Sequence, residues 1–190
     1  MKLKNSCALL AIFVCMPLFL FSQDKKDDKW KKREVGLQLV GLDNFDFDFL
    51  YKQQVGENAF RRINVGFARL DLRDVGDDGG GTFNLGISIA REKRIPLTDK
   101  MNLVQAPGWL FNTALASNGD NTIANFSTGL SFVLGVHYQL SDHFYIGAEV
   151  FPSILMGFTI TEDGFNDLDF TASFTTQNVG VSVVYKFEKK

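Results

Sequence analysis

The chain has 190 residues, of which 45% are hydrophobic and 22% charged, so it is long enough for one domain with a sizeable core. Its net charge of −2 gives no support for general electrostatic binding to DNA or RNA, and we expect no nucleic-acid partner. The 19 phenylalanines are a high count, and the fold must provide a place for them.

Residues 1–22 have the order of a secretory signal peptide: basic residues, an apolar run and a small residue before the cleavage point. Lys2 and Lys4 precede the apolar run, which is shorter than the roughly 20 residues of a membrane-spanning helix, although a retained N-terminal anchor is the alternative. Removal of this segment leaves 18 basic and 22 acidic residues, a net charge of −4. We therefore expect export of the chain from the cytoplasm.

Both cysteines, Cys7 and Cys15, lie inside this predicted signal peptide. The exported chain then has no thiol for a disulfide, a metal site or nucleophilic catalysis. A lipoprotein with a lipidated Cys15 is an alternative, but Phe13 and Val14 are large residues where such signals prefer small ones.

Residues 23–33 form a mixed-charge stretch that we expect to be a lead-in, and residues 34–190 form the predicted barrel domain. From residue 34 onward apolar and polar residues alternate with a period of two, which is typical of strands with two different faces. The phase slips near Ala68, as at a bulge, and Pro107 interrupts one segment. The predicted strands are 35–42, 45–52, 63–72, 83–90, 103–116, 128–140, 144–150 and 168–187.

Turn-rich segments separate these strands, so the prediction is an all-β, antiparallel up-and-down barrel of about eight strands. An even number of strands brings both termini to the same end. The connections predicted at that end are 55–58, 93–100 and 141–142, and those at the opposite end are 42–44, 74–81, 117–121 and 161–167.

Alternation alone fits both a soluble barrel with an apolar interior and a transmembrane barrel with an apolar exterior. A soluble barrel would cover its polar face with charged residues, whereas this second face is mainly Gly, Ser, Asn and Ala. Aromatic residues also fall near strand ends, where membrane interfaces would lie, at Tyr138, Phe144, Tyr185 and Phe187. The sequence therefore favours a transmembrane barrel, with the phenylalanines facing lipid.

With this pattern, the region from Glu34 to Phe187 resembles the small outer-membrane β-barrel proteins of diderm bacteria. The resemblance implies that Val183, Tyr185 and Phe187 of the last strand form a signal for the barrel-assembly machinery. This chain departs from the pattern because EKK follows the terminal aromatic residue. The resemblance also implies an outer-membrane location, contact with outer-membrane lipids, and N- and C-termini in the periplasm.

Several polar side chains fall on the predicted interior face. His137 and Glu149, with Ser131 or Ser182, contain the residue types of a hydrolytic set. One possible base without demonstrated convergence is a weak basis for catalysis, so we expect a buried polar network and no catalytic residue. Lys186 lies on the same face, and interior side chains usually fill an eight-stranded barrel, so we expect a plugged interior lined also by Lys52 and Glu92.

The acidic segments DVGDDGGG and TEDGFNDLD offer oxygen ligands, but neither has the spacing of a calcium loop. We therefore expect no metal and no cofactor. The leading hypothesis is a non-enzymatic outer-membrane barrel with a structural or surface-interaction role. A narrow channel or small-molecule transporter, a lipid-modifying enzyme and a soluble ligand-binding barrel are the alternatives, and the sequence names no extracellular partner.

Overall fold

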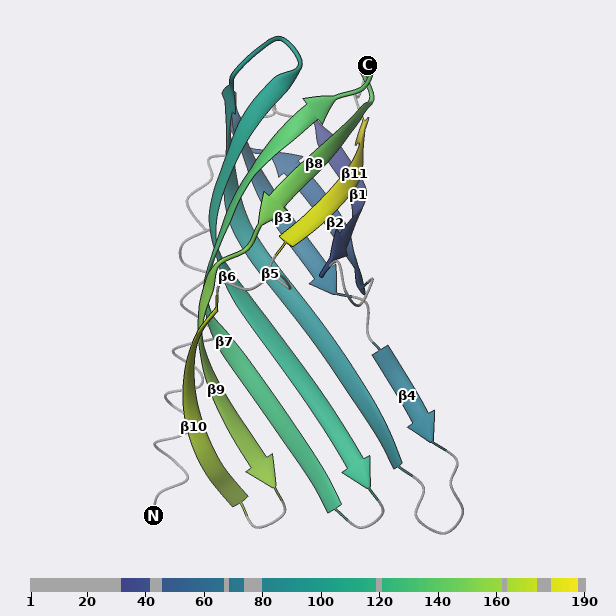
Figure 1. The fold of residues 1–190 in the computed structure, drawn as a ribbon, viewed down its shortest axis with the longest axis vertical. Helices are drawn as coiled ribbons and strands as arrows, with labels where there is room; N and C mark the ends of the chain where they lie inside the picture. The colour runs from purple at the N-terminus through teal and green to yellow at the C-terminus, as the bar shows by residue number, and fades with distance from the viewer. Residues whose placement is uncertain are drawn as a thin grey trace. The chain divides into compact units, whose positions relative to one another are not determined.

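The computed structural model describes residues 32–41, 46–66, 69–73, 80–118, 121–161, 164–173 and 179–187 (Figure 1). All of them belong to one compact unit, Lys31–Lys190. The predicted signal peptide and most of the lead-in lie outside the described residues. The described part contains no helix long and apolar enough to cross a membrane.

The described residues form strands joined by short turns, as the alternating sequence predicts. The strands are β1 (Arg33–Val40), β2 (Asp46–Gln54), β3 (Ala59–Gly66), β4 (Arg69–Arg73), β5 (Gly80–Pro96), β6 (Met101–Asn118), β7 (Asn121–Gln139), β8 (Phe144–Val150), β9 (Ser153–Thr161), β10 (Gly164–Ser173) and β11 (Val179–Phe187).

These elements build a closed, antiparallel, eight-stranded barrel, which confirms the predicted fold class. The hydrogen-bonded ring runs β1, β2, β3, β5, β6, β7, β8, β11 and back to β1. The other three elements continue the wall away from this ring: β4 pairs with β5, β9 with β7, and β10 with β9. Two of the predicted strands, 63–72 and 168–187, are therefore each divided into two elements.

The divisions correct parts of the sequence prediction. The last strand, predicted as 168–187, is β10 and β11, and 153–161 is a strand that the prediction left out. Pro152, which has no N–H to donate, stands between β8 and β9 while its carbonyl accepts a hydrogen bond from the Phe132 amide at 2.9 Å.

The predicted interruption at Pro107 is wrong, because β6 passes through it. Pro107 is paired with Phe132 of β7, but it has no registered partner on β5. The strand therefore loses ladder bonds on one side and keeps them on the other. The predicted connection 93–100 is also too long, since β5 continues to Pro96 and the turn occupies 97–100.

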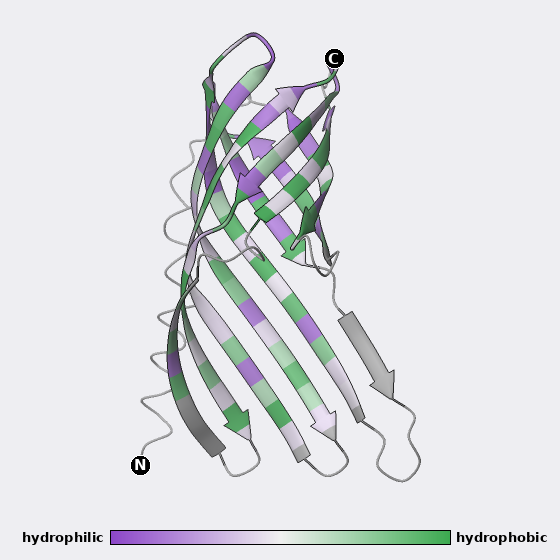
Figure 2. Cartoon of the chain, viewed as in Figure 1, coloured by the Kyte–Doolittle hydropathy of each residue, from purple (hydrophilic) through white to green (hydrophobic). Residues whose placement is uncertain are grey.

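One face of the wall is apolar and exposed, and within the closed ring the other face is polar and buried. Figure 2 shows the two kinds of residue alternating along the strands that it colours by hydropathy. On β11, Val183 is 52% exposed and the neighbouring Ser182 is fully buried. The outward set includes Leu37, Phe47, Phe49, Leu130, Phe132, Leu134, Tyr138, Phe144, Ile154, Phe170, Val181 and Phe187. This is the inside-out arrangement expected of a barrel whose exterior meets lipid.

At one end of the barrel, backbone hydrogen bonds link the short turns to one another and to the first and last strands. Gln54 donates to the Lys32 carbonyl at 2.9 Å, and Gln139 donates to the Lys100 carbonyl at 2.8 Å. Lys186 closes the circle by donating to the His143 carbonyl at 2.8 Å. We call this end, with the turns 55–58, 97–100 and 140–143, the turn rim. Connections 42–45, 74–79, 119–120 and 162–163 lie outside the described residues.

Candidate functional site: a charged network inside the barrel

Long charged and polar side chains fill the barrel interior near the turn rim. We call this set the polar plug, and it comprises Glu34, Gln38, Lys52, Arg62, Asn64, Glu92, Arg94, His137, Tyr145 and Glu149. They come from β1, β2, β3, β5, β7 and β8, each from an inward position of its strand. Three carboxylates and three permanently or normally cationic side chains thus share one enclosed volume.

Arg62 organises the half of the plug farther from the turn rim. Its two terminal nitrogens donate to the two carboxylate oxygens of Glu149 at 2.8 and 2.7 Å. Its Nε donates to the Asn64 side-chain oxygen at 2.9 Å, and Nη2 also donates to Gln38 at 3.1 Å. The planar guanidinium matches the carboxylate in this two-bond arrangement, so the buried charges are both paired and hydrogen-bonded.

Lys52, Glu92, Arg94 and Glu34 continue the network towards the turn rim. Lys52 lies 2.6 Å from Glu92, and Arg94 donates to Glu92 at 2.7 Å. Arg94 also donates to both oxygens of Glu34, at 2.9 and 2.6 Å. The Tyr145 hydroxyl donates to Glu34 at 2.7 Å, so β8 is joined to β1 across the interior. Alternating charge signs compensate the cost of removing these groups from water.

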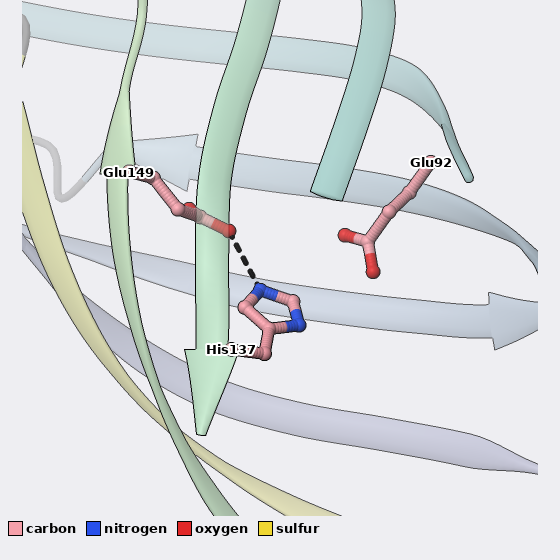
Figure 3. Close-up of side chains that lie close together, drawn as sticks. All are labelled: Glu92, His137 and Glu149. Atoms are coloured by element: carbon pink, nitrogen blue, oxygen red, sulfur yellow. Dashed lines mark hydrogen bonds and ion pairs between the residues drawn. The ribbon is translucent and has the colours of Figure 1, made fainter. Parts of the chain in front are cut away.

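His137 and Glu149, both predicted for the interior, are buried and adjacent. The His137 Nε2 lies 2.9 Å from Glu149 Oε1. Figure 3 shows Glu92 on the other side of the imidazole ring. Within the described part of the chain, the His137 Nδ1 has no hydrogen-bond partner.

The two predicted serines differ in their relation to His137. Ser182 and His137 both lie opposite Gly147, on either side of it, and both are buried. The Ser182 hydroxyl nevertheless makes no hydrogen bond to a described residue. Ser131 pairs with Ser153 of β9 and lies outside the plug. The structure therefore brings Ser182, His137 and Glu149 together without the nucleophile-to-base hydrogen bond that hydrolysis requires.

Glu92, His137 and Glu149 present potential metal-ligand atoms within 4.8 Å of one another (Figure 3). Each carboxylate already has a cationic partner, Lys52 for Glu92 and Arg62 for Glu149. A divalent ion would have to displace those cations into an interior where their charge has no other compensation. The donor set does not fit a resident metal, and we assign none.

Lys186, the third predicted interior residue, lies on β11 at the turn-rim edge of the barrel. Its ammonium group donates to the Gln139 side-chain oxygen and lies 5.4 Å from the Tyr145 ring centroid. On the outward face of the same strand, Tyr185 packs edge-on against Phe144 at 4.9 Å and Phe187 at 4.7 Å between ring centroids. Val183, Tyr185 and Phe187 thus share one lipid-facing side, and their role in assembly stays a prediction.

Sequence reasoning missed Glu34, Gln38, Arg62, Asn64, Arg94 and Tyr145 as members of the plug. Arg62 follows Arg61 in the sequence, and Arg94 follows Lys93. Because both residues of each pair are basic, the alternation of polar and apolar residues does not show which one faces inward. The remaining signal was the position of each residue in the period-two pattern. Leu50, Lys52 and Gln54 all face inward on β2, and Arg62 of β3 is paired with Lys52, so it faces the same side.

No protein-family model matches the chain, and no curated protein matches its sequence. Among solved structures, a major outer membrane protein from Thermus thermophilus is similar with a TM-score of 0.49 and 14% identity. That likeness covers 82% of this chain and 98% of the other. Ail, the attachment invasion locus protein of Yersinia pestis, is similar with a TM-score of 0.40 and 13% identity, over 82% of this chain and 95% of the other.

The fold itself supplies the classification. The barrel is closed, antiparallel and eight-stranded, with an apolar exterior and a polar, filled interior. Soluble barrels of this size have the opposite arrangement, with apolar residues inside. By its architecture, the described part of the chain has the fold of a small transmembrane β-barrel.

Proposed function

We propose that the protein is a non-enzymatic barrel of the outer membrane with a structural or surface-interaction role. The observation that carries this proposal is the polar plug, in which Arg62, Glu92 and Glu149 are at most 2% exposed. An interior filled by paired charges leaves the outer surface and the end of the barrel opposite the turn rim for function.

The strand lengths support a wall that extends beyond the bilayer. β5, β6 and β7 have 17, 18 and 19 residues. A tilted strand needs only about 9 to 11 residues to cross the hydrocarbon core. The additional residues of β5–β7 at the end opposite the turn rim, with β4 and the ends of β9 and β10 near residues 161 and 164 beside them, would stand clear of lipid and present a surface to the exterior.

For orientation, we propose that the turn rim and both termini face the periplasm. The predicted signal peptide would deliver the chain to that compartment, and outer-membrane barrels have short turns on their periplasmic side. The turns at the turn rim are four residues each, at 55–58, 97–100 and 140–143. Protease protection of an epitope placed in the 97–100 turn, in intact cells, tests this arrangement.

The plug does not favour the channel alternative. A conducting path needs a continuous column of water, and the ion pairs between β2 and β5 and between β3 and β8 lie across the interior. The lipid-modifying enzyme is also disfavoured, because Ser182, His137 and Glu149 are at most 2% exposed in the described part of the chain. Unchanged lipid profiles in His137→Ala and deletion strains, compared with wild type, would support the non-enzymatic proposal.

Heat-modifiable migration tests the proposal directly. Folded transmembrane barrels resist detergent and migrate differently before and after boiling, so membrane-extracted protein is expected to show two positions on an electrophoresis gel. Cell fractionation supplies the second measurement. Recovery of the protein in the soluble periplasmic fraction alone, without a heat-dependent shift, would overturn the assignment to the outer membrane.

A further inference from the structure

Basic side chains gather on the outward face of the barrel near the turn rim. Arg61 of β3 lies directly opposite Arg91 of β5, and Lys93 lies one outward position farther along β5. Their inward neighbours, Arg62 and Glu92, are buried in the plug, so these three side chains are on the exterior. These three side chains form one basic patch on the exterior.

Arg91 and Lys93 are exposed, and neither forms an ion pair with a residue that the structure describes. They border a hollow of about 650 Å³, together with Gln105, Pro107 and Phe132. Two carboxylates also border it. Glu57 is in the exposed turn, and the side chain of Glu92 is directed inward and paired with Lys52 and Arg94.

A second, mainly apolar hollow of about 510 Å³ continues from the first. Pro107 and Phe132 line both hollows, and Leu130, Pro152 and Ile154 line the second. It lies beside Pro152, where the registered pairing with β7 pauses between Val150 of β8 and Ser153 of β9. Since Leu130 and Ile154 are opposite each other farther from the turn rim, the apolar hollow leads away from the basic residues along the lipid-facing wall.

We propose that these two hollows bind one anionic phospholipid, with its headgroup phosphate at Arg91 and Lys93 and an acyl chain over Pro107, Phe132 and Leu130. The inference rests on the proposed membrane location. The unpaired cations favour an anionic headgroup over a zwitterionic one. The apolar continuation favours a lipid over a soluble anion, because only an amphiphile fills both hollows.

Trp109 offers a reporter, because it lies opposite Leu130 on the outward face of β6. The full chain carrying Trp30→Phe is refolded in phosphatidylcholine vesicles with a minor fraction of phosphatidylglycerol. Two samples are compared: in one the brominated acyl chains are on phosphatidylglycerol, and in the other they are on the same mole fraction of phosphatidylcholine. Bromine quenches the indole fluorescence at short range. Stronger quenching by brominated phosphatidylglycerol is expected, and equal quenching by the two lipids would overturn the site.

The variant pair Arg91→Gln with Lys93→Gln tests the headgroup contact. Each basic side chain near an anionic lipid surface contributes about a fivefold preference, so the preference for phosphatidylglycerol is expected to fall roughly 25-fold. Lys32→Gln with Lys100→Gln removes the same charge from exposed positions at the same rim, outside the hollow, and is expected to retain most of the preference. An equal loss in this control would show a general surface effect and overturn the site.

Two further measurements separate the remaining explanations. Arg91→Lys with Lys93→Arg keeps both charges and is expected to keep the preference, and loss of the preference in this folded variant would overturn the site. Release of the quenching by millimolar inorganic phosphate would indicate a simple anion site and overturn the lipid assignment. Heat-modifiable migration of the same samples distinguishes failures: no folded barrel contradicts the proposed function, whereas a folded barrel without lipid preference contradicts the lipid site alone.

Discussion

Arg62 joins four strands through one side chain, since it contacts Gln38 of β1, Asn64 of β3 and Glu149 of β8 and lies 3.6 Å from Glu92 of β5. Arg62→Met leaves the Glu149 carboxylate buried without its principal cation. The variant is expected to lose about 3 to 5 kcal/mol of unfolding free energy, measured by urea titration in lipid vesicles.

A matched substitution distinguishes burial from loss of charge. Arg91→Met removes the same group from the exterior of the neighbouring strand, and in vesicles of phosphatidylcholine alone it is expected to change stability little. Combining Arg62→Met with Glu149→Met removes both charges, and recovery of part of the lost stability is expected. If Arg62→Met and Arg91→Met cost the same, the network is not the source of interior stability.

At the scale of the strand pair, β7 and β9 approach so closely that one glycine is required and a nearby one is not. A Cβ on Gly129 would lie 2.0 Å from the Ile154 carbonyl oxygen, whereas on Gly157 the nearest atom is at 3.7 Å. Gly129→Ala is therefore expected to destabilise the barrel by about 1 to 3 kcal/mol. Gly157→Ala is expected to be neutral or slightly stabilising. Equal urea midpoints for the two variants would contradict this account of the β7–β9 contact.

The last strand, β11, carries a separate prediction about assembly. Tyr185→Ala with Phe187→Ala removes the outward-facing aromatic pair, which the family resemblance assigns to recognition by the assembly machinery. The folded, heat-modifiable fraction in cells is expected to fall severalfold, whereas refolding of the purified chain into vesicles is expected to change much less. Val181→Ala, on the same outward face, is the control. An equal defect in cells and in vesicles would indicate a packing role instead.

For the whole molecule, the plug predicts an absence of steady ion conductance in planar bilayers. Lys52→Ser with Glu92→Ser removes an ion pair of 2.6 Å together, so net charge is unchanged and space for water opens. Small conductance steps are expected from this variant and not from wild type. Arg91→Ser with Lys93→Ser, on the exterior, is expected to remain silent. Porin-like conductance from the wild-type protein would contradict a filled interior.

Much of the barrel was predictable because period-two alternation depends on local sequence. Val183 and Ser182 are assigned to opposite faces by that pattern, and the structure agrees. The divisions near Pro152 depend on how neighbouring strands twist, which no single segment reports. The local pattern also cannot predict which interior side chains pair with each other. Arg62 and Glu149 are 87 positions apart in the sequence and meet only when the barrel closes.

The buried charges also make the barrel intolerant of misalignment. Because side chains alternate in a strand, sliding one strand by a single residue would turn Glu34, Lys52 or Arg62 outward into lipid and bring apolar neighbours inside. A basic residue on the lipid face costs about 2 to 4 kcal/mol near the bilayer midplane. Each strand that contributes to the plug therefore carries its own penalty against slippage, so the filled interior selects one alignment of the sheet from many with similar backbone hydrogen bonding.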